Sequence, residues 1–211
     1  TLVKNRHIVK AVSLPIGALT LTGTYQKGDE YTPKELEKMT KAVKKTIKEH
    51  TWLQNIKLPL LGIGGTARNI AKIDQRKLSY PITKLHNYEL PYHRFHEILE
   101  DVKGKSLEAR KKISGLSSDR ADIIIAGLTI VDELFNYVNT KTLVVGGCGL
   151  REGLFYDYYG EYYLGGNSII DDILVHSAEN VLLGMTKHEL VHAKYITKLA
   201  TTLYDALEPL H

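Results

Sequence analysis

Cysteine is nearly absent from this chain of 211 residues, which contains one, Cys148. A single thiol excludes an internal disulfide and a cysteine-rich zinc site, and it is typical of a protein from a reducing compartment. No apolar run reaches the roughly 20 residues that a membrane-spanning helix needs, and no signal peptide is recognisable. We therefore expect a cytoplasmic protein without a membrane span.

A large excess of charge of one sign is also lacking. The formal net charge is +4, and 43% of the residues are hydrophobic. This composition is ordinary for a soluble globular protein, and it permits an anionic partner without requiring one. The chain begins with Thr1 rather than methionine, and Leu2 and Val3 resemble the second half of a strand. We therefore expect a piece of a longer protein.

Residues 2–24 are rich in β-branched and apolar side chains. This composition predicts two or three antiparallel strands in a meander, with a hairpin turn at Asn5 and Arg6. A helix is predicted next, over residues 33–50, because Thr32 and Pro33 suit a helix cap and a first helical position. Its lysines lie mostly off the apolar stripe, which favours a solvated face over an anion patch.

The later part of the chain is predicted to be mainly helical. Two helices are expected in residues 86–115, and a long buried helix in residues 118–138, where the apolar pattern continues past three consecutive isoleucines without a helix breaker. Two more helices are expected in residues 168–185 and 186–207, with a hinge at residues 165–167.

Residues 58–73 combine an apolar run, three glycines in four positions and a helical composition. They predict a strand, a tight turn and a helix with Thr66 as its cap. The unpaired first amides of such a helix favour an anion, and phosphate is the best fit. The glycine spacing matches neither a Walker A loop nor a dinucleotide-binding fingerprint. A structural turn that needs glycine for positive φ is the alternative.

Residues 141–153 repeat this order of strand, glycine cluster and helix start. The recurrence predicts an α/β architecture in which both glycine clusters lie at the carboxyl ends of strands, where open sheets bind their ligands. It strengthens the case for a phosphate site.

A possible metal-binding pattern lies near the end of the chain. His188, Glu189 and His192 satisfy the His-Glu-x-x-His pattern, which places two imidazoles on one helix face, able to hold zinc, with the glutamate as general base. A catalytic zinc also needs a third ligand, and the chain after His192 offers only poorly placed carboxylates and a terminal histidine. Two surface histidines are therefore expected, and a zinc hydrolase is the remote alternative.

Four motifs occur in a specific order along residues 1 to about 160, at residues 12–22, 62–70, 115–127 and 149–154. Together they resemble the exopolyphosphatase and guanosine pentaphosphate phosphohydrolase (Ppx/GppA) family. The tail of the chain resembles the start of that family's helical third domain, which is related to HD-type phosphohydrolases. That likeness gives the two histidines an explanation that needs no zinc.

The resemblance implies an α/β, ribonuclease H-like fold of the actin-like ATPase superfamily, with a β meander, then alternating helices and strands, then C-terminal helices. Residues 1–164 would be the family's second ribonuclease H-like domain, truncated at its N-terminus, and residues 165–211 the start of a helical HD-like domain. The family's first domain carries a glutamate thought to be the general base, and its second domain opens with a glycine-rich phosphate loop. Neither is in this sequence, so no catalytic residue and no metal ligand is assigned.

The resemblance also implies which residues would face phosphate. Arg120 would reach the phosphate chain or pair with Asp119 or Glu152, whereas Arg151 and Glu152 would form a structural ion pair. The phosphate-binding candidates are Gly64, Gly65, Thr66, Arg68, Arg120, Gly146, Gly147 and Gly149. Two nearby carboxylates, Asp74 and Asp122, are expected in surface or capping roles.

The implied activity of the parent protein is Mg²⁺-dependent release of phosphate from the end of polyphosphate, or conversion of guanosine pentaphosphate to tetraphosphate. We expect this chain alone to be inactive without the missing first domain. The exposed apolar surface of a cut domain favours self-association, for example into a homodimer. No nucleic acid is expected as a partner. A non-catalytic polyphosphate- or nucleotide-binding module of the same fold is the alternative.

Overall fold

The structure is a computed structural model that describes residues 1–163, 165–166, 172, 174–176, 178 and 186–207. Its contacts divide the chain into two compact units, Thr1–Phe155 and Tyr156–His211. The division falls inside helix α7 (Leu150–Tyr163), and the expected domain boundary between residues 164 and 165 stays a prediction. Most of the helix expected in residues 168–185 lies outside the described residues, as does Asn167 of the expected hinge.

The first unit begins with a hairpin in which β1 (Leu2–Lys4) pairs antiparallel with β2 (His7–Lys10). Asn5 and Arg6 have φ angles of 50° and 65°, as a two-residue type I′ turn requires. The predicted hairpin turn is therefore confirmed.

A third strand does not follow the hairpin, because residues 18–25 form helix α1 (Ala18–Tyr25). The threonines of this segment favour a strand locally, but α1 packs against α2 and α6 and buries Leu21. The hydroxyl of Thr24 donates a hydrogen bond to the carbonyl of Thr20 at 2.8 Å, within the same helix. Tertiary packing overrides the local preference for a strand in this segment.

Helix α2 (Pro33–Lys48) begins as predicted. Thr32 and Glu35 form a reciprocal capping box, and Pro33 occupies the first turn. Its apolar stripe is fully buried at Met39 and Val43. The stripe packs on α6, and this contact covers one face of the core.

The main sheet has three strands in the order β3-β5-β4. β3 (Leu60–Gly62) runs parallel to β5 (Thr142–Val145), and β4 (Tyr88–Pro91) pairs antiparallel with β5. β4 was not predicted. It is only four residues long, and only two of its side chains, Tyr88 and Leu90, are buried, which is too short an alternation to recognise in the sequence. The two helices expected after it are α4 (Tyr92–Lys103) and α5 (Leu107–Lys111).

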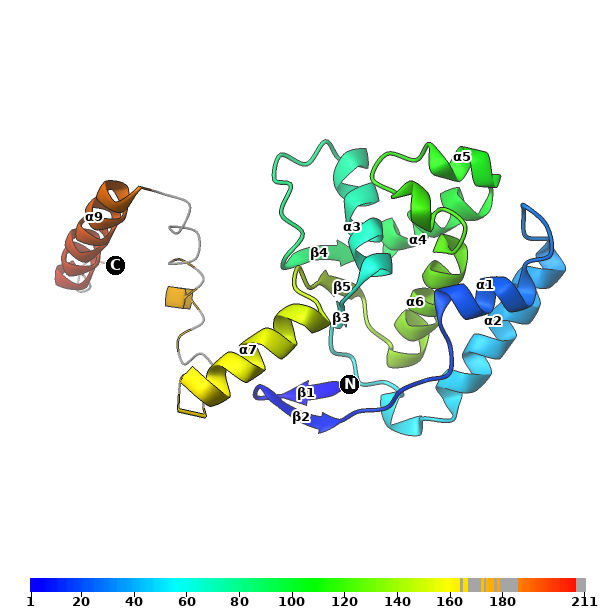
Figure 1. Cartoon of the computed structure of the whole chain (residues 1–211), viewed down its shortest axis with the longest axis horizontal. Helices are drawn as coiled ribbons and strands as arrows, with labels where there is room; N and C mark the ends of the chain where they lie inside the picture. The colour runs from blue at the N-terminus through cyan, green and yellow to red at the C-terminus, as the bar shows by residue number, and fades with distance from the viewer. Residues whose placement is uncertain (164, 167–171, 173, 177, 179–185, 208–211) are drawn as a thin grey trace. The chain divides into compact units, whose positions relative to one another are not determined.

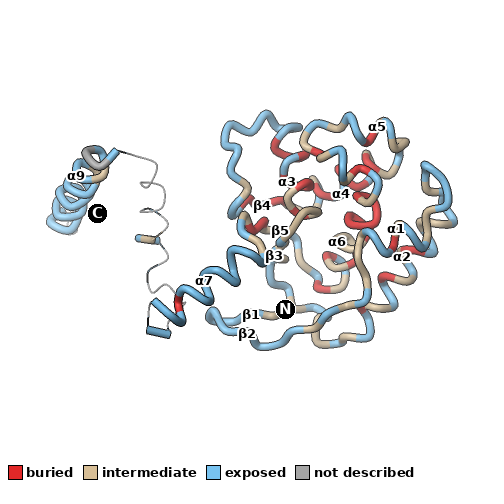
Figure 2. Tube along the Cα trace, viewed as in Figure 1, coloured by how far each residue is buried: buried red, intermediate tan, exposed pale blue. Residues whose placement is uncertain are grey.

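Helix α6 (Ile124–Val138) is the centre of the core. It contacts α1, α2, α3 and α4, and Figure 2 shows its buried residues together with those of α3 and α4. The prediction of a helix rather than a strand at the isoleucines is confirmed, but the helix begins at Ile124, with Ile123 as its N-cap, and not at residue 118, where a short 3₁₀ turn (Ser118–Arg120) lies.

Helix α3 (Gly65–Lys77) follows β3 and packs on α4, α6 and the sheet, as Figure 1 shows. The second unit contains α9 (Lys187–Ala206), which begins with a capping box between Thr186 and Glu189, as expected for the last helix. In the described part of the chain, no helix has the length and apolar character needed to cross a membrane.

The close approach of α3 to α6 depends on Gly127. A Cβ at this position would lie 2.7 Å from Cγ2 and 2.9 Å from Oγ1 of Thr66. We expect Gly127→Val to lower the free energy of unfolding by about 2–3 kcal/mol, because overpacking forces the helices apart. Thr66→Ala in the same chain should recover part of the loss, as measured by urea denaturation in a double-mutant cycle.

Gly23 in α1 is the matched control, because a Cβ there meets nothing within 4 Å. Gly23→Val should change the stability by less than about 0.5 kcal/mol. Equal losses at the two glycines would contradict the close contact between α3 and α6.

Candidate functional site

Two glycine turns lie side by side at one edge of the main sheet. Because β3 and β5 are parallel, their carboxyl ends meet at the same edge. The N–H of Gly146 donates to the carbonyl of Gly62 at 2.9 Å, and a Cβ on Gly146 would lie 3.2 Å from Ile63. The predicted repetition of strand, glycine turn and helix therefore brings both turns to one place.

The first turn leaves the start of α3 uncapped. Gly64 is the N-cap, with φ of 108°, and no side chain caps the helix. Thr66 is the second residue of the helix rather than its cap, which corrects the prediction. Its side chain packs at Gly127 instead. The first N–H groups of α3 have no partner within the helix and carry the positive end of its dipole.

Arg120 lies against this helix start. A Cβ on Gly65 would lie 2.6 Å from Cζ of Arg120 and 2.7–2.9 Å from its two terminal nitrogens. The glycine therefore makes room for the guanidinium group. None of the ion pairs among the described residues involves Arg120, so neither Asp119 nor Glu152 neutralises it there. A cation and the positive end of a helix dipole repel each other. An anion bound between them is attracted to both, so the arrangement favours anion binding.

Asn69 ties the segment that carries Arg120 to α3. Its side chain, 5% exposed, donates to the carbonyl of Gly65 at 2.8 Å and accepts from the N–H of Ser117 at 2.7 Å. The N–H of Arg120 in turn donates to the carbonyl of Ser117 at 2.9 Å. Asn69 was not among the predicted site residues, and its signal in the sequence was a polar residue at a position where the helical pattern is buried.

The second turn has the N–H groups of its three glycines occupied. Gly146 donates to the main sheet, Gly147 donates to Nδ1 of His86 at 3.2 Å, and Gly149 donates to the carboxylate of Glu152 at 2.7 Å. Phosphate binding by Gly146, Gly147 and Gly149 stays a prediction. The geometry favours the first turn, because its amides are not engaged in this way.

Glu152 caps the start of α7 and is not paired with Arg151 in any ion pair of the described residues, which corrects the expected structural pair. Hydrogen bonds from its own backbone N–H and from that of Gly149 lower the pKa of the Glu152 carboxyl, with smaller contributions from Arg151 and Arg68. Arg68, half-buried on α3, therefore directs part of its positive field toward the second turn.

The two nearby carboxylates have different roles. Asp74 is 2% exposed and accepts a hydrogen bond from the hydroxyl of Tyr88 at 2.6 Å, with Arg94 at 3.4 Å. It is a buried structural group, so the expected surface or capping role is wrong. Burial, followed by this hydrogen bond, raises the pKa of Tyr88. Asp122 is exposed, as expected for a surface role, and accepts from the N–H of Ile123, but no side chain caps α6.

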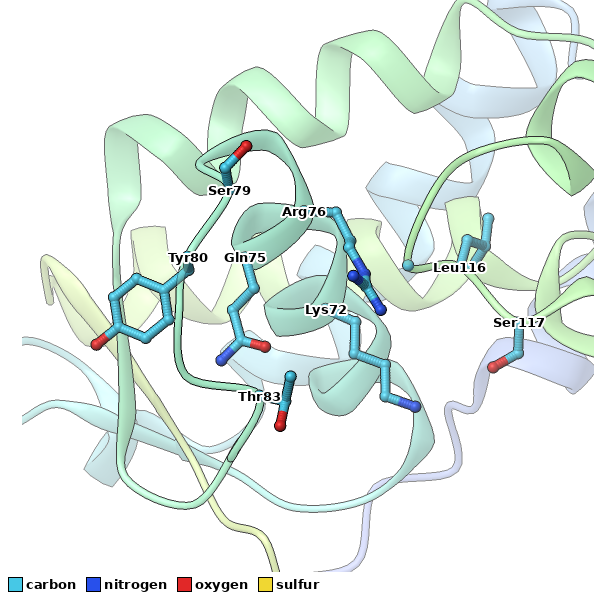
Figure 3. Close-up of a pocket in the computed structure, with 9 residues that line it drawn as sticks. Lys72, Gln75, Arg76, Ser79, Tyr80, Thr83, Leu116 and Ser117 are labelled. Atoms are coloured by element: carbon cyan, nitrogen blue, oxygen red, sulfur yellow. The ribbon is translucent and has the colours of Figure 1, made fainter.

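A polar pocket of about 600 Å³ lies along the later turns of α3. Figure 3 shows Lys72 and Arg76 projecting from this helix toward the segment that carries Ser117. With Arg68 they form a series of cations at four-residue spacing, which spans about 12 Å of helix. The four-residue spacing of these cations is visible in the sequence, but Lys72 and Arg76 were not predicted as site residues. No acidic residue lines the pocket, whose lining is Lys72, Gln75, Arg76, Ser79, Tyr80, Thr83, Gly115, Leu116 and Ser117.

Ligands for a metal ion are not gathered in the described residues, which contain no group of three or more histidine, cysteine, aspartate or glutamate side chains able to hold one. The side chain of His188 lies outside the described residues, and that of His192 is exposed. The carboxylate of Glu189 accepts from the N–H and hydroxyl of Thr186 at 2.7 and 2.8 Å, so it acts as a helix cap.

Comparison with known proteins gives a consistent result. Residues 1–161 match the Ppx/GppA phosphatase family. The chain belongs to this family. The crystal structure of the Aquifex aeolicus family member is 26% identical, with a TM-score of 0.66, over 76% of this chain and 52% of that one. An exopolyphosphatase from Cytophaga hutchinsonii, 19% identical over 74% of this chain and 52% of that one, has the same fold, with a TM-score of 0.68.

A bifunctional 3-dehydroquinate synthase/phosphatase of Fusobacterium nucleatum is 26% identical over 148 residues, which are 69% of this chain and 22% of that protein. The expected α/β fold of the actin-like ATPase type is confirmed by the solved Ppx/GppA structures. This chain spans about half the length of those structures.

The bridge made by Asn69 generates a stability prediction. Asn69→Ala leaves the N–H of Ser117 without its acceptor in a part-buried position, and such losses cost about 1–3 kcal/mol. We expect a decrease of that size in the free energy of unfolding, measured by urea denaturation. Asn136→Ala removes a similar side-chain hydrogen bond at an exposed position, so it should cost less than about 0.5 kcal/mol. Equal effects would contradict the bridging role.

Proposed function

We propose that this chain supplies the phosphate-binding half of a phosphoanhydride hydrolase, which releases phosphate from the end of polyphosphate or converts guanosine pentaphosphate to tetraphosphate. The observation that carries the proposal is the guanidinium of Arg120, which lies against Gly65 at the uncapped start of α3 and forms no ion pair with the described residues. Both groups donate hydrogen bonds and carry positive charge. Family membership supports a phosphate ester or anhydride as the ligand.

The proposed role of these residues follows from the chemistry of phosphoryl transfer. The reaction needs a positioned water, a group that orients or deprotonates it, and donors that stabilise the charge on the transferring phosphoryl group. The N–H groups of Gly65 and Thr66 would hold terminal phosphate oxygens, and Arg120 would balance their charge. Arg68, Lys72 and Arg76 would attract the rest of an extended phosphate chain along α3.

The other half of the chemistry belongs to the longer protein. We propose that its first domain supplies the general base and that the reaction uses Mg²⁺, which neutralises charge on phosphate oxygens when bound. A cytoplasmic location and a homodimer are part of the same proposal. This chain alone would bind phosphate chains without cleaving them.

Binding of tripolyphosphate tests the role of Arg120. We expect Arg120→Gln to weaken binding at least tenfold, which is about 1.4 kcal/mol, as measured by isothermal titration calorimetry. Lys41→Gln removes the same charge from an exposed pair with Glu37, and it should leave the affinity within twofold.

Glu152→Gln distinguishes the two glycine turns in the same assay. Its loss of charge would strengthen binding markedly if the second turn held the phosphate, and should change it little if the first turn does. An unchanged affinity in Arg120→Gln, or a large gain in Glu152→Gln, would contradict the proposed site.

An activity assay tests whether this chain binds phosphate chains but needs the first domain to hydrolyse them. We expect the chain of 211 residues to release no phosphate above background from polyphosphate or guanosine pentaphosphate in the presence of Mg²⁺, although it binds tripolyphosphate. A longer protein that includes a first domain should hydrolyse at least one of these substrates. Hydrolysis by the present chain would overturn the proposal. Binding without hydrolysis in the longer protein would favour a non-catalytic phosphate-binding module.

A further inference from the structure

Arg110 of α5 has the largest of the fully buried side chains in the described part of the chain, with 0% of its surface exposed. An arginine is almost never buried this deeply without a charged partner. None of the ion pairs among the described residues involves Arg110, and burial lowers the pKa of its guanidinium. Its burial therefore needs a reason other than a salt bridge.

The guanidinium of Arg110 joins two backbone segments. Nε donates to the carbonyl of Ala121 at 2.8 Å, and Nη1 donates to the carbonyl of Lys105 at 2.9 Å. Lys105 lies just after α4, and its N–H donates to the carbonyl of Val102 in that helix at 3.2 Å. Because α4 packs on α3 and α6, Arg110 connects Ala121 to the core of the first unit.

Ala121 is the residue directly after Arg120. It is the C-cap of the 3₁₀ turn Ser118–Arg120, and its N–H donates to the carbonyl of Ser118 at 3.3 Å. Its carbonyl lies before the start of α6 at Ile124. The hydrogen bond from Arg110 therefore fixes the backbone on the C-terminal side of Arg120.

The segment that carries Arg120 is held at both ends. On the N-terminal side, the buried side chain of Asn69 accepts from the N–H of Ser117 at 2.7 Å. On the C-terminal side, Arg110 donates to Ala121. The two contacts come from different helices, α3 and α5. Both are made to the backbone, so the side chain of Arg120 stays available for a ligand.

The position of the Arg120 guanidinium leaves little room for movement. A Cβ on Gly65 would lie only 2.6 Å from its Cζ, so the group fits closely against the start of α3. A binding group works well only when it is held within about 0.5 Å of its productive position by the groups around it. A backbone shift at Ala121 would move the guanidinium away from the helix start.

We propose that Arg110 is a positioning residue for phosphate binding, which holds the backbone beside Arg120 and thereby directs the Arg120 guanidinium to a phosphate at the start of α3. The inference rests on the proposed function and adds a residue to it. Arg110 itself is fully buried, so it acts through Arg120. Its planar fork of donors suits two carbonyls at once, and the compact ammonium group of a lysine does not reproduce this fork.

Binding of tripolyphosphate to the chain of 211 residues, measured by isothermal titration calorimetry, tests the inference. Arg110→Met removes both hydrogen bonds, and we expect it to weaken binding at least fivefold. In a chain that already carries Arg120→Gln, the same change should alter the affinity less than twofold, because the group that Arg110 positions is gone. Lys111→Met is the control, since it removes an exposed charge from the same helix, and it should leave the affinity within twofold.

Arg110→Lys keeps the positive charge, so it tests the fork in a chain that is easier to fold. We expect it to weaken binding at least threefold. NMR of the ¹⁵N-labelled chain without ligand gives a second readout. The Nε–H signal of Arg120 should shift or broaden in Arg110→Lys, because the guanidinium is no longer held in one place. The Nε–H signal of Arg76 should not change.

Three results would each overturn the inference. They are an affinity within twofold of the unchanged chain in Arg110→Lys, an unchanged Arg120 signal in that variant, and equal losses from Arg110→Met with and without Arg120→Gln. Equal losses would indicate a general effect of charge or folding instead of positioning. Failure of the phosphate proposal would appear separately, as an unchanged tripolyphosphate affinity in Arg120→Gln, and the Arg120 signal would still show whether Arg110 holds that side chain.

Discussion

The parallel pairing of β3 with β5, extended by the hydrogen bond between Gly146 and Gly62, is the contact on which the candidate site depends. A strand three residues long and one four residues long contribute little stability by themselves. Their pairing decides that two turns, about 80 residues apart in the sequence, open at the same edge. The helices that follow, α3 and α7, then begin from neighbouring points, and the buried helix α6 holds α3 in place through the contact at Gly127.

Electrostatics distinguishes the two turns more than shape does. The start of α3 combines a dipole end, free amides and the guanidinium of Arg120, and nothing among the described residues neutralises them. These positive groups repel one another. Covalent geometry and the buried side chain of Asn69 hold them together. Structures hold like charges together in this way where an anion completes the arrangement.

Local sequence rules succeeded where the local chemistry decides the structure. The hairpin turn at Asn5, the helix cap at Thr32 and the strand-glycine-helix order were all predicted, because each depends on residues within a few positions of one another. The family motifs gave the fold. Helix α1 and strand β4 were missed, because packing on distant elements decides both of them. Contact between Arg120 and Gly65 joins residues 55 positions apart, and no spacing rule predicts it.

The carboxylate of Glu152 gives the second glycine turn a resident anion of its own. Because it is tethered three residues from the amide that it occupies, its effective concentration there is high. A phosphate that reached this turn would have to displace an intramolecular competitor and loosen the first turn of α7, whereas at Gly65 no carboxylate of the described residues caps the helix. At this edge of the sheet, one turn is therefore open to an anion and the other is occupied by a carboxylate. If the proposed function holds, a phosphate chain would bind with its end at the first turn.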